Sequence, residues 1–254
     1  MIVIDAITLD DIDVIAQAVI ALNWNVLAVD PGPFTERLAM RRGLMREKPR
    51  QPLKPLPADQ QQGSIVIVAG SATAVTKQQL QHLITHDSRV CHIPVDAELL
   101  IDQANAADIE INRIVEQAQK CVSLYKNALF VFESALTGRL LDLQEEERRF
   151  QLQHGQAADN INKGLGLIVK NILTSAPEAI RGLYMTGGDT LVNVLKELGA
   201  TGIDMIDYVI PQTDMVRIIG GDFSGLVCVG KGGLTGPEEI ISTIVDYIYK
   251  ESMQ

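Results

Sequence analysis

Apolar runs alternate with amphipathic stretches along most of this sequence, and the alternation predicts strands followed by helices. Short runs rich in Ile, Val and Leu predict strands at residues 64–69, 89–93, 128–132, 182–185, 208–210, 215–218 and 226–229. Apolar residues at helical spacing predict helices at 107–125, 156–174, 191–198 and 237–249, and a capping box at 76–79 predicts the start of another. We therefore expect an α/β fold, a three-layer α/β/α unit with a mostly parallel or mixed sheet.

The first 46 residues predict a smaller α/β series of the same kind. Residues 2–4 and 26–29 are expected to form short strands, and residues 34–42 a short helix. Thr8 is expected to cap the helix between the two strands. The buried stripe of that helix would consist of Ile12, Ile15, Ala16 and Val19.

Residues 47–63 differ from both series, because they contain four prolines and four glutamines with almost no apolar periodicity. Such a composition is typical of an exposed linker. The sequence therefore predicts a domain at residues 1–46, a linker at 47–63 and a larger domain at 64–254.

Composition narrows the class of protein. Aromatic residues make up only 4% of the chain, so the core must consist mostly of Ile, Val, Leu and Ala, as in parallel sheets covered by helices. The formal net charge of −10 argues against nucleic acid as a partner. It does not exclude a small anionic ligand, because backbone amides and a few local cations can hold phosphate.

The cysteines and the hydropathy profile indicate a soluble cytoplasmic protein without a membrane partner. Cys91, Cys121 and Cys228 are far apart and odd in number, so neither a disulfide framework nor a metal-binding cysteine pair is expected. The first residues lack the features of a signal peptide, and no segment approaches the ~20 apolar residues that span a bilayer.

Three turns rich in small residues follow predicted strands and precede predicted helices. In an open α/β sheet, ligands bind at the carboxyl ends of the strands, where helix amides are free to hold an anion. The first turn contains Gly70, Ser71 and Thr73, whose hydroxyls can bond a ligand. An ordinary strand-to-helix loop is the alternative for this turn.

The second turn contains the adjacent glycines Gly187 and Gly188, followed by Asp189 and Thr190. Ordering two neighbouring glycines costs conformational entropy, so their presence favours a functional role for this turn. Asp189 is expected to orient a Mg²⁺-bound water, to bind a ribose hydroxyl, or only to cap the helix.

The third turn, at residues 230–236, contains four glycines and Lys231, with Gly232 and Gly233 directly after the lysine. Flexible backbone donors beside a cation suit phosphate. The turn is not a P-loop, since the lysine precedes the glycine pair. A glycine-rich turn with an incidental surface lysine is the alternative.

Other polar groups are weaker candidates. The histidines His82, His86, His92 and His154 have no metal-binding partners at usable spacing, and we expect no metal site built from side chains. A buried thiol is the expected state of Cys91. The acidic residues Asp10, Asp11 and Asp13 suit a first helical turn, and the charged run 145–149 is expected to be a solvated helix face.

The three turns together resemble a known family. Their segments, in chain order, are Gly70-Ser71-x-Thr73-x-x-Thr76-x-x-Gln79, Thr186-Gly187-Gly188-Asp189-Thr190 and Lys231-Gly232-Gly233-x-x-Gly236. From residue 64 to the end, the chain resembles the nucleotide-binding C-terminal domain of the four-carbon acid sugar kinases, which act on D-threonate, D-erythronate or 3-oxo-tetronate. The second segment looks more like the threonate and erythronate kinases than the 3-oxo-tetronate kinases.

The resemblance implies an ATP-dependent, Mg²⁺-requiring kinase. ATP would be held by Ser71, by residues 187–190 and by Gly233, with Lys231 close to the phosphates. These kinases begin with a sugar-acid domain whose Asp-Asp-x-Thr-Gly motif supplies the catalytic carboxylate, and no such motif occurs here. Residues 1–46 resemble only the tail of that domain, so the catalytic residues remain unassigned.

The sequence also departs from the family pattern within the chain. Gly230 stands where the family usually has Thr, Thr73 replaces Ser, and Pro31-Gly32-Pro33-Phe34 replaces a glycine-rich turn. Because the sugar-acid domain is incomplete in this chain, we expect ATP binding with little turnover by the chain alone. The alternative functions are a non-catalytic nucleotide- or metabolite-binding module, a partner for a separately encoded substrate-binding half, or another α/β enzyme with a phosphate ligand. The expected partner arrangement is a homo-oligomer or a complementary N-terminal chain.

Overall fold

A computed structural model describes residues 2–30, 32–46, 57, 61–70, 73–124, 127–134, 136, 141–232 and 234–253, with the side chains of 122–124 left out. The chain divides into two compact units, Met1–Leu53 and Lys54–Gln254.

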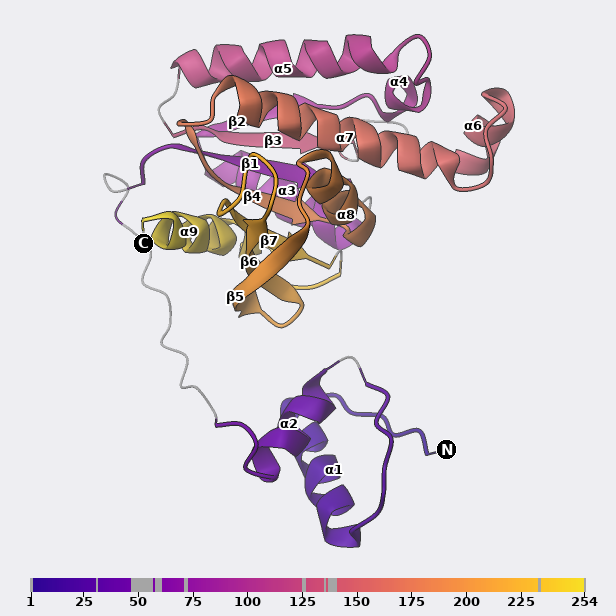
Figure 1. The fold of residues 1–254 in the computed structure, drawn as a ribbon, viewed down its shortest axis with the longest axis vertical. Coiled ribbons are helices and arrows are strands. Elements are labelled where there is room, and N and C mark those ends of the chain that lie inside the picture. The colour runs from indigo at the N-terminus through magenta and orange to yellow at the C-terminus, as the bar shows by residue number, and fades with distance from the viewer. Residues whose placement is uncertain are drawn as a thin grey trace. The chain divides into compact units, whose positions relative to one another are not determined.

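The larger unit is built on a seven-stranded sheet in the order β2-β3-β1-β4-β7-β6-β5, as far as the described residues show (Figure 1). The strands are β1 (Ser64–Ala69), β2 (Val90–Pro94), β3 (Leu129–Glu133), β4 (Ile180–Thr186), β5 (Gly202–Ile210), β6 (Thr213–Ile219) and β7 (Val227–Lys231). The first five strands of that order are mutually parallel, whereas β6 runs antiparallel to both β7 and β5. The sheet is therefore mixed and mostly parallel, as predicted.

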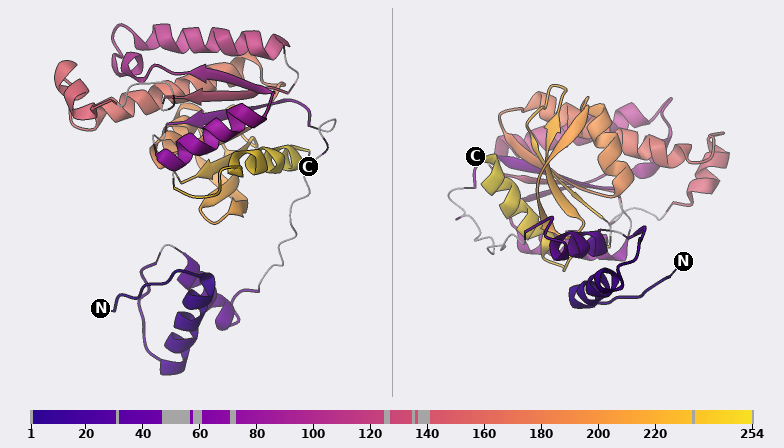
Figure 2. Two further views of the ribbon diagram at one scale, coloured as in Figure 1. Left: turned by 180° about the vertical axis from the view of Figure 1, so that it is seen from behind. Right: turned by 60° about the horizontal axis from the view of Figure 1, so that its bottom comes forward.

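Helices cover both faces of this sheet, as the two directions of view show (Figure 1; Figure 2). One face packs against α4 (Ala97–Ile101), α5 (Ala107–Leu124), α7 (Gln156–Ser175) and α8 (Gly188–Glu197). The other packs against α3 (Ala74–His86) and α9 (Ile240–Ser252). All six residues of β1 are buried, because a central parallel strand is covered on both sides. The three-layer α/β/α prediction is confirmed.

Two helices begin at other residues than the sequence predicted. Thr73 caps α3 by accepting a hydrogen bond from the Thr76 amide, so the helix starts before the expected capping box at residues 76–79. The final helix, α9, begins at Ile240 rather than at Pro237. Thr76 looks like a cap but lies in the first turn of α3, because caps and first-turn residues share the same preferences. Pro237 and the two glutamates after it precede α9, in a turn that ends at the N-cap residue Glu239.

The expectation that no disulfide forms is wrong. Cys91 on β2 and Cys121 on α5 are bonded through their sulfur atoms, with their Cα atoms 6.6 Å apart. The two residues are 30 positions apart in sequence, and only the packing of α5 against β2 brings them together. Cys228 is a buried free cysteine.

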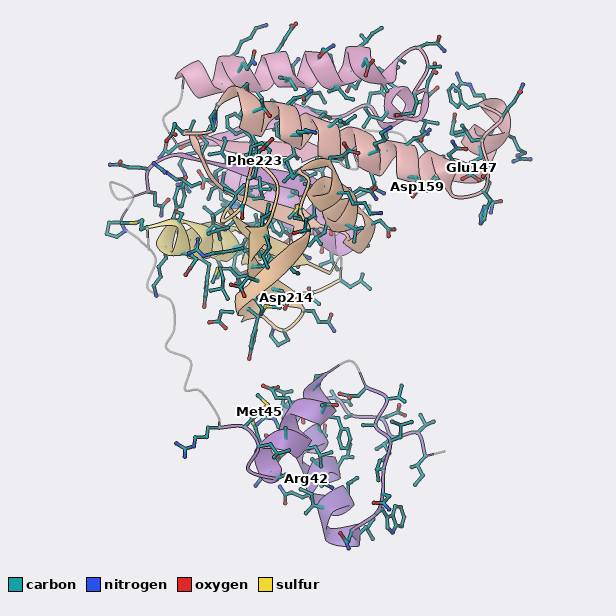
Figure 3. The ribbon with its side chains drawn as sticks, in the orientation of Figure 1. Arg42, Met45, Glu147, Asp159, Asp214 and Phe223 are labelled. Carbon is teal, nitrogen blue, oxygen red and sulfur yellow. A yellow bond between two sulfur atoms is a disulfide. The ribbon has the colours of Figure 1, made fainter. Side chains whose placement is uncertain are left out.

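The charged run at residues 145–149 is not simply a solvated face. It forms α6 (Leu143–Arg149), and Glu146 and Glu147 are buried. The carboxylate of Glu147, a residue labelled in Figure 3, accepts a hydrogen bond from the Gly155 amide over 2.7 Å. This bond joins α6 to the start of α7. A carboxylate bonded in this way can be buried because its charge is met by a donor.

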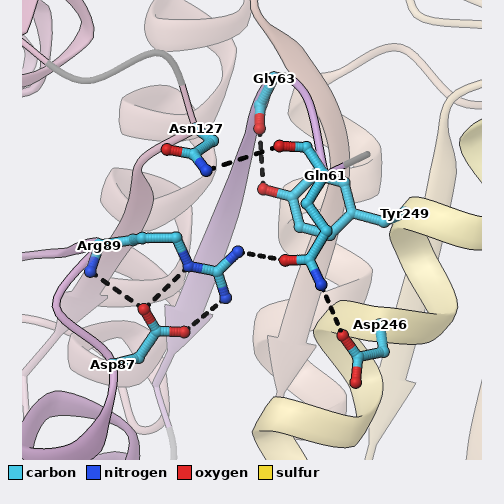
Figure 4. A network of polar contacts seen from close by, with 7 residues as sticks. All are labelled: Gln61, Gly63, Asp87, Arg89, Asn127, Asp246 and Tyr249. Carbon is cyan, nitrogen blue, oxygen red and sulfur yellow. Dashed lines mark hydrogen bonds and ion pairs between the residues drawn. The ribbon is translucent and has the colours of Figure 1, made fainter. Parts of the chain in front are cut away.

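A polar network closes the amino-terminal edge of the sheet, where the chain enters β1 (Figure 4). Arg89 pairs with Asp87 at 2.5 Å and also donates to Gln61, whose amide donates to Asp246 at 3.1 Å. The Tyr249 hydroxyl donates to the Gly63 carbonyl over 2.8 Å, and burial raises the pKa of this tyrosine to about 12. This edge lies opposite the strand ends where ligands bind.

The smaller unit contains α1 (Leu9–Leu22) and α2 (Pro33–Arg41). Thr8 caps α1 in a capping box with Asp11, as the sequence predicted, and Ala16 is its buried residue. The two strands predicted at residues 2–4 and 26–29 are wrong, since these segments have no strand structure. Strands need a hydrogen-bonding neighbour, and the described part of this unit offers none. Their apolar side chains stay exposed, including Val29 at 94%.

No helix in the described parts of the chain has both the length and the apolar character needed to cross a membrane.

Candidate functional site

The three glycine-rich turns follow β1, β4 and β7, and these strands are neighbours in the sheet (Figure 1). Ala69 pairs with Thr186, and Thr186 pairs with Lys231, so the strands end at the same level. All three run parallel, which places the three turns side by side at the carboxyl edge.

The first turn leaves β1 through Gly70, where a side chain would not fit. A Cβ atom there would lie 2.1 Å from the Thr190 hydroxyl of the second turn. Thr73 lies at the cap of α3. Ser71, the other predicted ligand of this turn, lies outside the described residues.

The second turn opens α8. Gly187 is the N-cap at a φ of 104°, a conformation that favours glycine, and its amide donates to the Lys231 carbonyl over 3.2 Å. Gly188 and Asp189 are exposed in the first turn of the helix, where backbone amides are available to an anion. Thr190, by contrast, is buried, and its hydroxyl donates to the Asn162 side chain over 2.8 Å. Thr190 therefore stabilises the turn through a buried hydrogen bond.

The third turn begins with Lys231, which is buried rather than an incidental surface lysine. Its ammonium donates to the carbonyls of Gly232 at 2.7 Å and Thr235 at 3.1 Å. Burial lowers its pKa to about 8. Gly232 is exposed, and Gly233 lies outside the described residues.

Gly230, where the family usually has Thr, packs closely under α8. A Cβ atom there would lie 2.2 Å from a methyl group of Leu191. The departure from the family pattern therefore accompanies a close approach between β7 and α8.

Two amide side chains at this edge were not assigned a role from the sequence. Asn162 on α7 holds Thr190, and Gln79 on α3 donates to the carbonyls of residues 235–237, at the end of the third turn, which is extended here to include Pro237 and Glu238. The sequence does contain a signal for Asn162. This polar residue lies three and seven positions before the buried Leu165 and Val169, so it shares their face of the helix. For Gln79, the capping-box interpretation concealed its role.

Further polar groups lie along the same edge. Glu133 at the end of β3 is fully buried, and His92 on β2 lies 2.9 Å from its carboxylate. Thr213 pairs with Lys231 across β6 and β7, and its buried hydroxyl has no hydrogen-bond partner among the described residues. Away from this edge, His82 and His86 stack on each other near the end of α3. Across the described ranges, no group of three or more His, Cys, Asp or Glu is arranged to hold a metal ion.

The arrangement has the donor set that a nucleotide phosphate needs. The start of α8 offers amides, the exposed glycines leave room for close approach, and Lys231 places a cation under the third turn.

Comparison with known proteins agrees with this geometry. The family model described as the nucleotide-binding C-terminal domain matches residues 66–241, a range that contains all three turns. A D-erythronate kinase from Heliobacterium modesticaldum is 33% identical over 248 residues, covering 98% of this chain and 53% of the relative. A D-threonate kinase from Salmonella typhimurium is 26% identical over 250 residues, covering 98% and 54%. The chain thus spans about half the length of these relatives.

Solved structures support the fold. A DUF1537 domain from Bordetella bronchiseptica has a TM-score of 0.57 at 22% identity, over 96% of this chain and 52% of that one. A DUF1537 protein from Haemophilus influenzae has a TM-score of 0.56 at 16% identity, over 98% and 52%. With the glycine turns at one sheet edge and the family match over residues 66–241, this chain belongs to the four-carbon acid sugar kinase family, in its nucleotide-binding C-terminal domain.

Proposed function

We propose that this chain binds Mg-ATP at the carboxyl edge of β1, β4 and β7, as the nucleotide-binding part of a kinase for D-erythronate or D-threonate. The observation that carries the proposal is the pairing of Ala69 with Thr186 and of Thr186 with Lys231, which sets three glycine-rich turns side by side. The names of the relatives support the substrate class.

Each part of the edge has a distinct task in this proposal. Bound ATP supplies the phosphoryl group, and Mg²⁺ offsets the charge on its oxygens. The amides of Gly188 and Asp189 hold phosphate oxygens at the start of α8, where the helix dipole favours negative charge. Lys231 would add positive charge from below the third turn, and the exposed Asp189 carboxylate would be placed to orient a water of the Mg²⁺ ion. Ser71 and Gly233 are proposed ligands on the strength of the family resemblance.

The acceptor side of the reaction would come from elsewhere. Phosphoryl transfer depends on positioning two substrates and stabilising charge, so a chain that holds only the donor has little turnover. The relatives are about twice as long, which supports a sugar-acid half in the part of them that this chain does not span. That half would belong to a longer form of the protein or to a second chain, in the cytoplasm. The Bordetella bronchiseptica structure is a domain-swapped dimer with bound citrate, which supports a homo-oligomer.

Binding is tested by calorimetry with a non-hydrolysable ATP analogue and Mg²⁺, with NAD and phosphosugars as comparison ligands. Gly188→Val is the decisive variant, because a Cβ at Gly188 meets nothing within 4 Å and its φ is ordinary, so the fold tolerates the change. The new side chain would occupy the anion position at the start of α8. We expect affinity to fall more than about tenfold with little change in melting temperature.

Gly202→Ala, on the far edge strand β5, is the matched control and should bind as the wild type does. Preference for NAD or a phosphosugar over the ATP analogue would instead favour another α/β enzyme. Nucleotide binding without any turnover after a sugar-acid half is supplied would favour a non-catalytic binding module. Rapid ADP release from D-threonate or D-erythronate by the chain alone would contradict the donor-only role.

A further inference from the structure

Gln79 reaches from α3 across to the third turn, although more than 150 residues separate them in sequence. Its side-chain nitrogen lies 3.0 Å from the Thr235 carbonyl oxygen, 2.9 Å from that of Gly236 and 3.1 Å from that of Pro237. The residue is 1% exposed. A flipped amide would turn its oxygen toward three carbonyl oxygens, so the hydrogen-bonding pattern fixes its orientation.

Lys231 acts on the same turn from the sheet. Its ammonium donates to the carbonyls of Gly232 and Thr235, so the carbonyl of Thr235 receives donors from both side chains. Four carbonyl groups of the turn are therefore turned inward, toward Gln79 and Lys231. The side chains of Gln79 and Lys231 therefore set the orientation of the backbone in this turn.

The orientation of the carbonyls decides where the amides point. In a planar trans peptide, the N–H points opposite to the C=O of the same unit. The amides of Gly236 and Glu238 share peptide units with the Thr235 and Pro237 carbonyls, so they point away from Gln79. Both residues are exposed, and Gly236 has a φ of 87° that suits glycine. The outward side of the turn thus carries the hydrogen-bond donors.

We propose that Gln79 is a positioning residue that presents the amides of the third turn to the phosphates of the nucleotide. The inference rests on the proposed nucleotide binding and adds to it a residue that does not itself touch the ligand. Because Gln79 lies on the helix that follows the first turn, it also fixes the third turn relative to the first. Loss of its amide would loosen the third turn while α3 stays packed through Leu80 and Leu83.

The test compares Gln79→Met with Gln79→Glu. Methionine keeps the length of the side chain without a donor, and glutamate turns an acceptor toward three carbonyls. Gln81→Met is the matched control, because Gln81 lies on the same helix and, among the residues that the structure describes, its side chain donates only to the exposed Thr85 hydroxyl. Affinities for adenosine, AMP, ADP and an ATP analogue are measured for all variants by calorimetry.

We expect Gln79→Met to weaken binding of the ATP analogue about tenfold, because ordered hydrogen-bond donors are lost. Binding of adenosine should hardly change. Gln79→Glu should weaken binding of the ATP analogue further, and Gln81→Met should bind it with the affinity of the wild type. Hydrogen exchange at residues 234–239 should speed up in Gln79→Met. An equal loss for adenosine and ATP, or no loss for either, would overturn the positioning role. If the wild type binds no nucleotide, the proposed function fails, while the exchange measurement still decides whether Gln79 holds the turn.

Discussion

The Thr190 hydroxyl donates a hydrogen bond to the Asn162 side-chain oxygen over 2.8 Å, and the same hydroxyl fills the space beside Gly70. Asn162 thereby joins the first and second turns from the α7 face of the sheet. Gln79 joins the first and third turns from the α3 face. The three turns are therefore braced by one buried or half-buried amide on each side of the sheet.

Asn162→Leu should weaken nucleotide binding through the second turn. The substitution keeps the size of the side chain and removes the acceptor, which leaves the buried Thr190 hydroxyl without its partner at a cost of about 1–3 kcal/mol. We expect a lower unfolding free energy by chemical denaturation and weaker binding of an ATP analogue. Adding Thr190→Val to Asn162→Leu should restore most of the stability, because both polar partners are then gone. Additive losses in the double variant would contradict the pairing.

Gly70→Ala should destabilise the protein through a steric conflict with Thr190. The new methyl group would lie 2.1 Å from the Thr190 hydroxyl, so the turn must shift, at a cost of about 1–3 kcal/mol. Thr190→Ala in the same chain removes the clashing atoms and should recover part of the loss. A melting temperature for Gly70→Ala equal to that of the wild type would show that the turn yields freely.

The sequence predicted what depends on local pattern, and missed what depends on distant contacts. Apolar runs located the central strands of the large unit, since a strand buried on both faces, such as β1, must be continuously apolar. Of the partly exposed β5, only the last three residues were predicted. The glycines of the three turns were equally visible, and their meeting at one edge follows from neighbouring parallel strands. The role of Gln79 was hidden, because its partners lie 156–158 residues away. The polar position of Asn162 was visible in the helical pattern, but its partner, 28 residues away, was not.

The two wrong predictions, of no disulfide and of strands at residues 2–4 and 26–29, have the same cause. Cys91 and Cys121 meet only because α5 packs on β2, which no spacing along the chain reveals. Residues 2–4 and 26–29 have the composition of strands, but a strand also requires a neighbour. Local preference is necessary in such segments, and tertiary contact decides the outcome.

The Cys91–Cys121 bond should contribute to stability under oxidising conditions. Closing a 30-residue separation removes unfolded-state entropy worth about 3–4 kcal/mol in the chain-entropy estimate. Under non-reducing denaturing conditions, a thiol assay should find one free cysteine, Cys228, and a reductant should raise the number to three and lower the melting temperature. Cys91→Ser with Cys121→Ser should melt at one temperature with or without reductant. Three free thiols in the oxidised wild type would contradict the bond.

Because of Lys231, a rise to alkaline pH should increase the stability of the fold and decrease the affinity for nucleotide. Burial lowers its pKa from 10.5 to about 8, so between these values the unfolded chain holds a proton that the folded chain has released. Stability attributable to Lys231 therefore rises as the pH increases from about 8 to 10.5. Affinity for an ATP analogue should fall over the same rise, because a neutral amine no longer attracts phosphate. Lys231→Met should bind more weakly at pH values below about 8 and should lose both responses. Calorimetry and denaturant titration at several pH values measure the two responses, and an unchanged pH profile in Lys231→Met would assign them to another group.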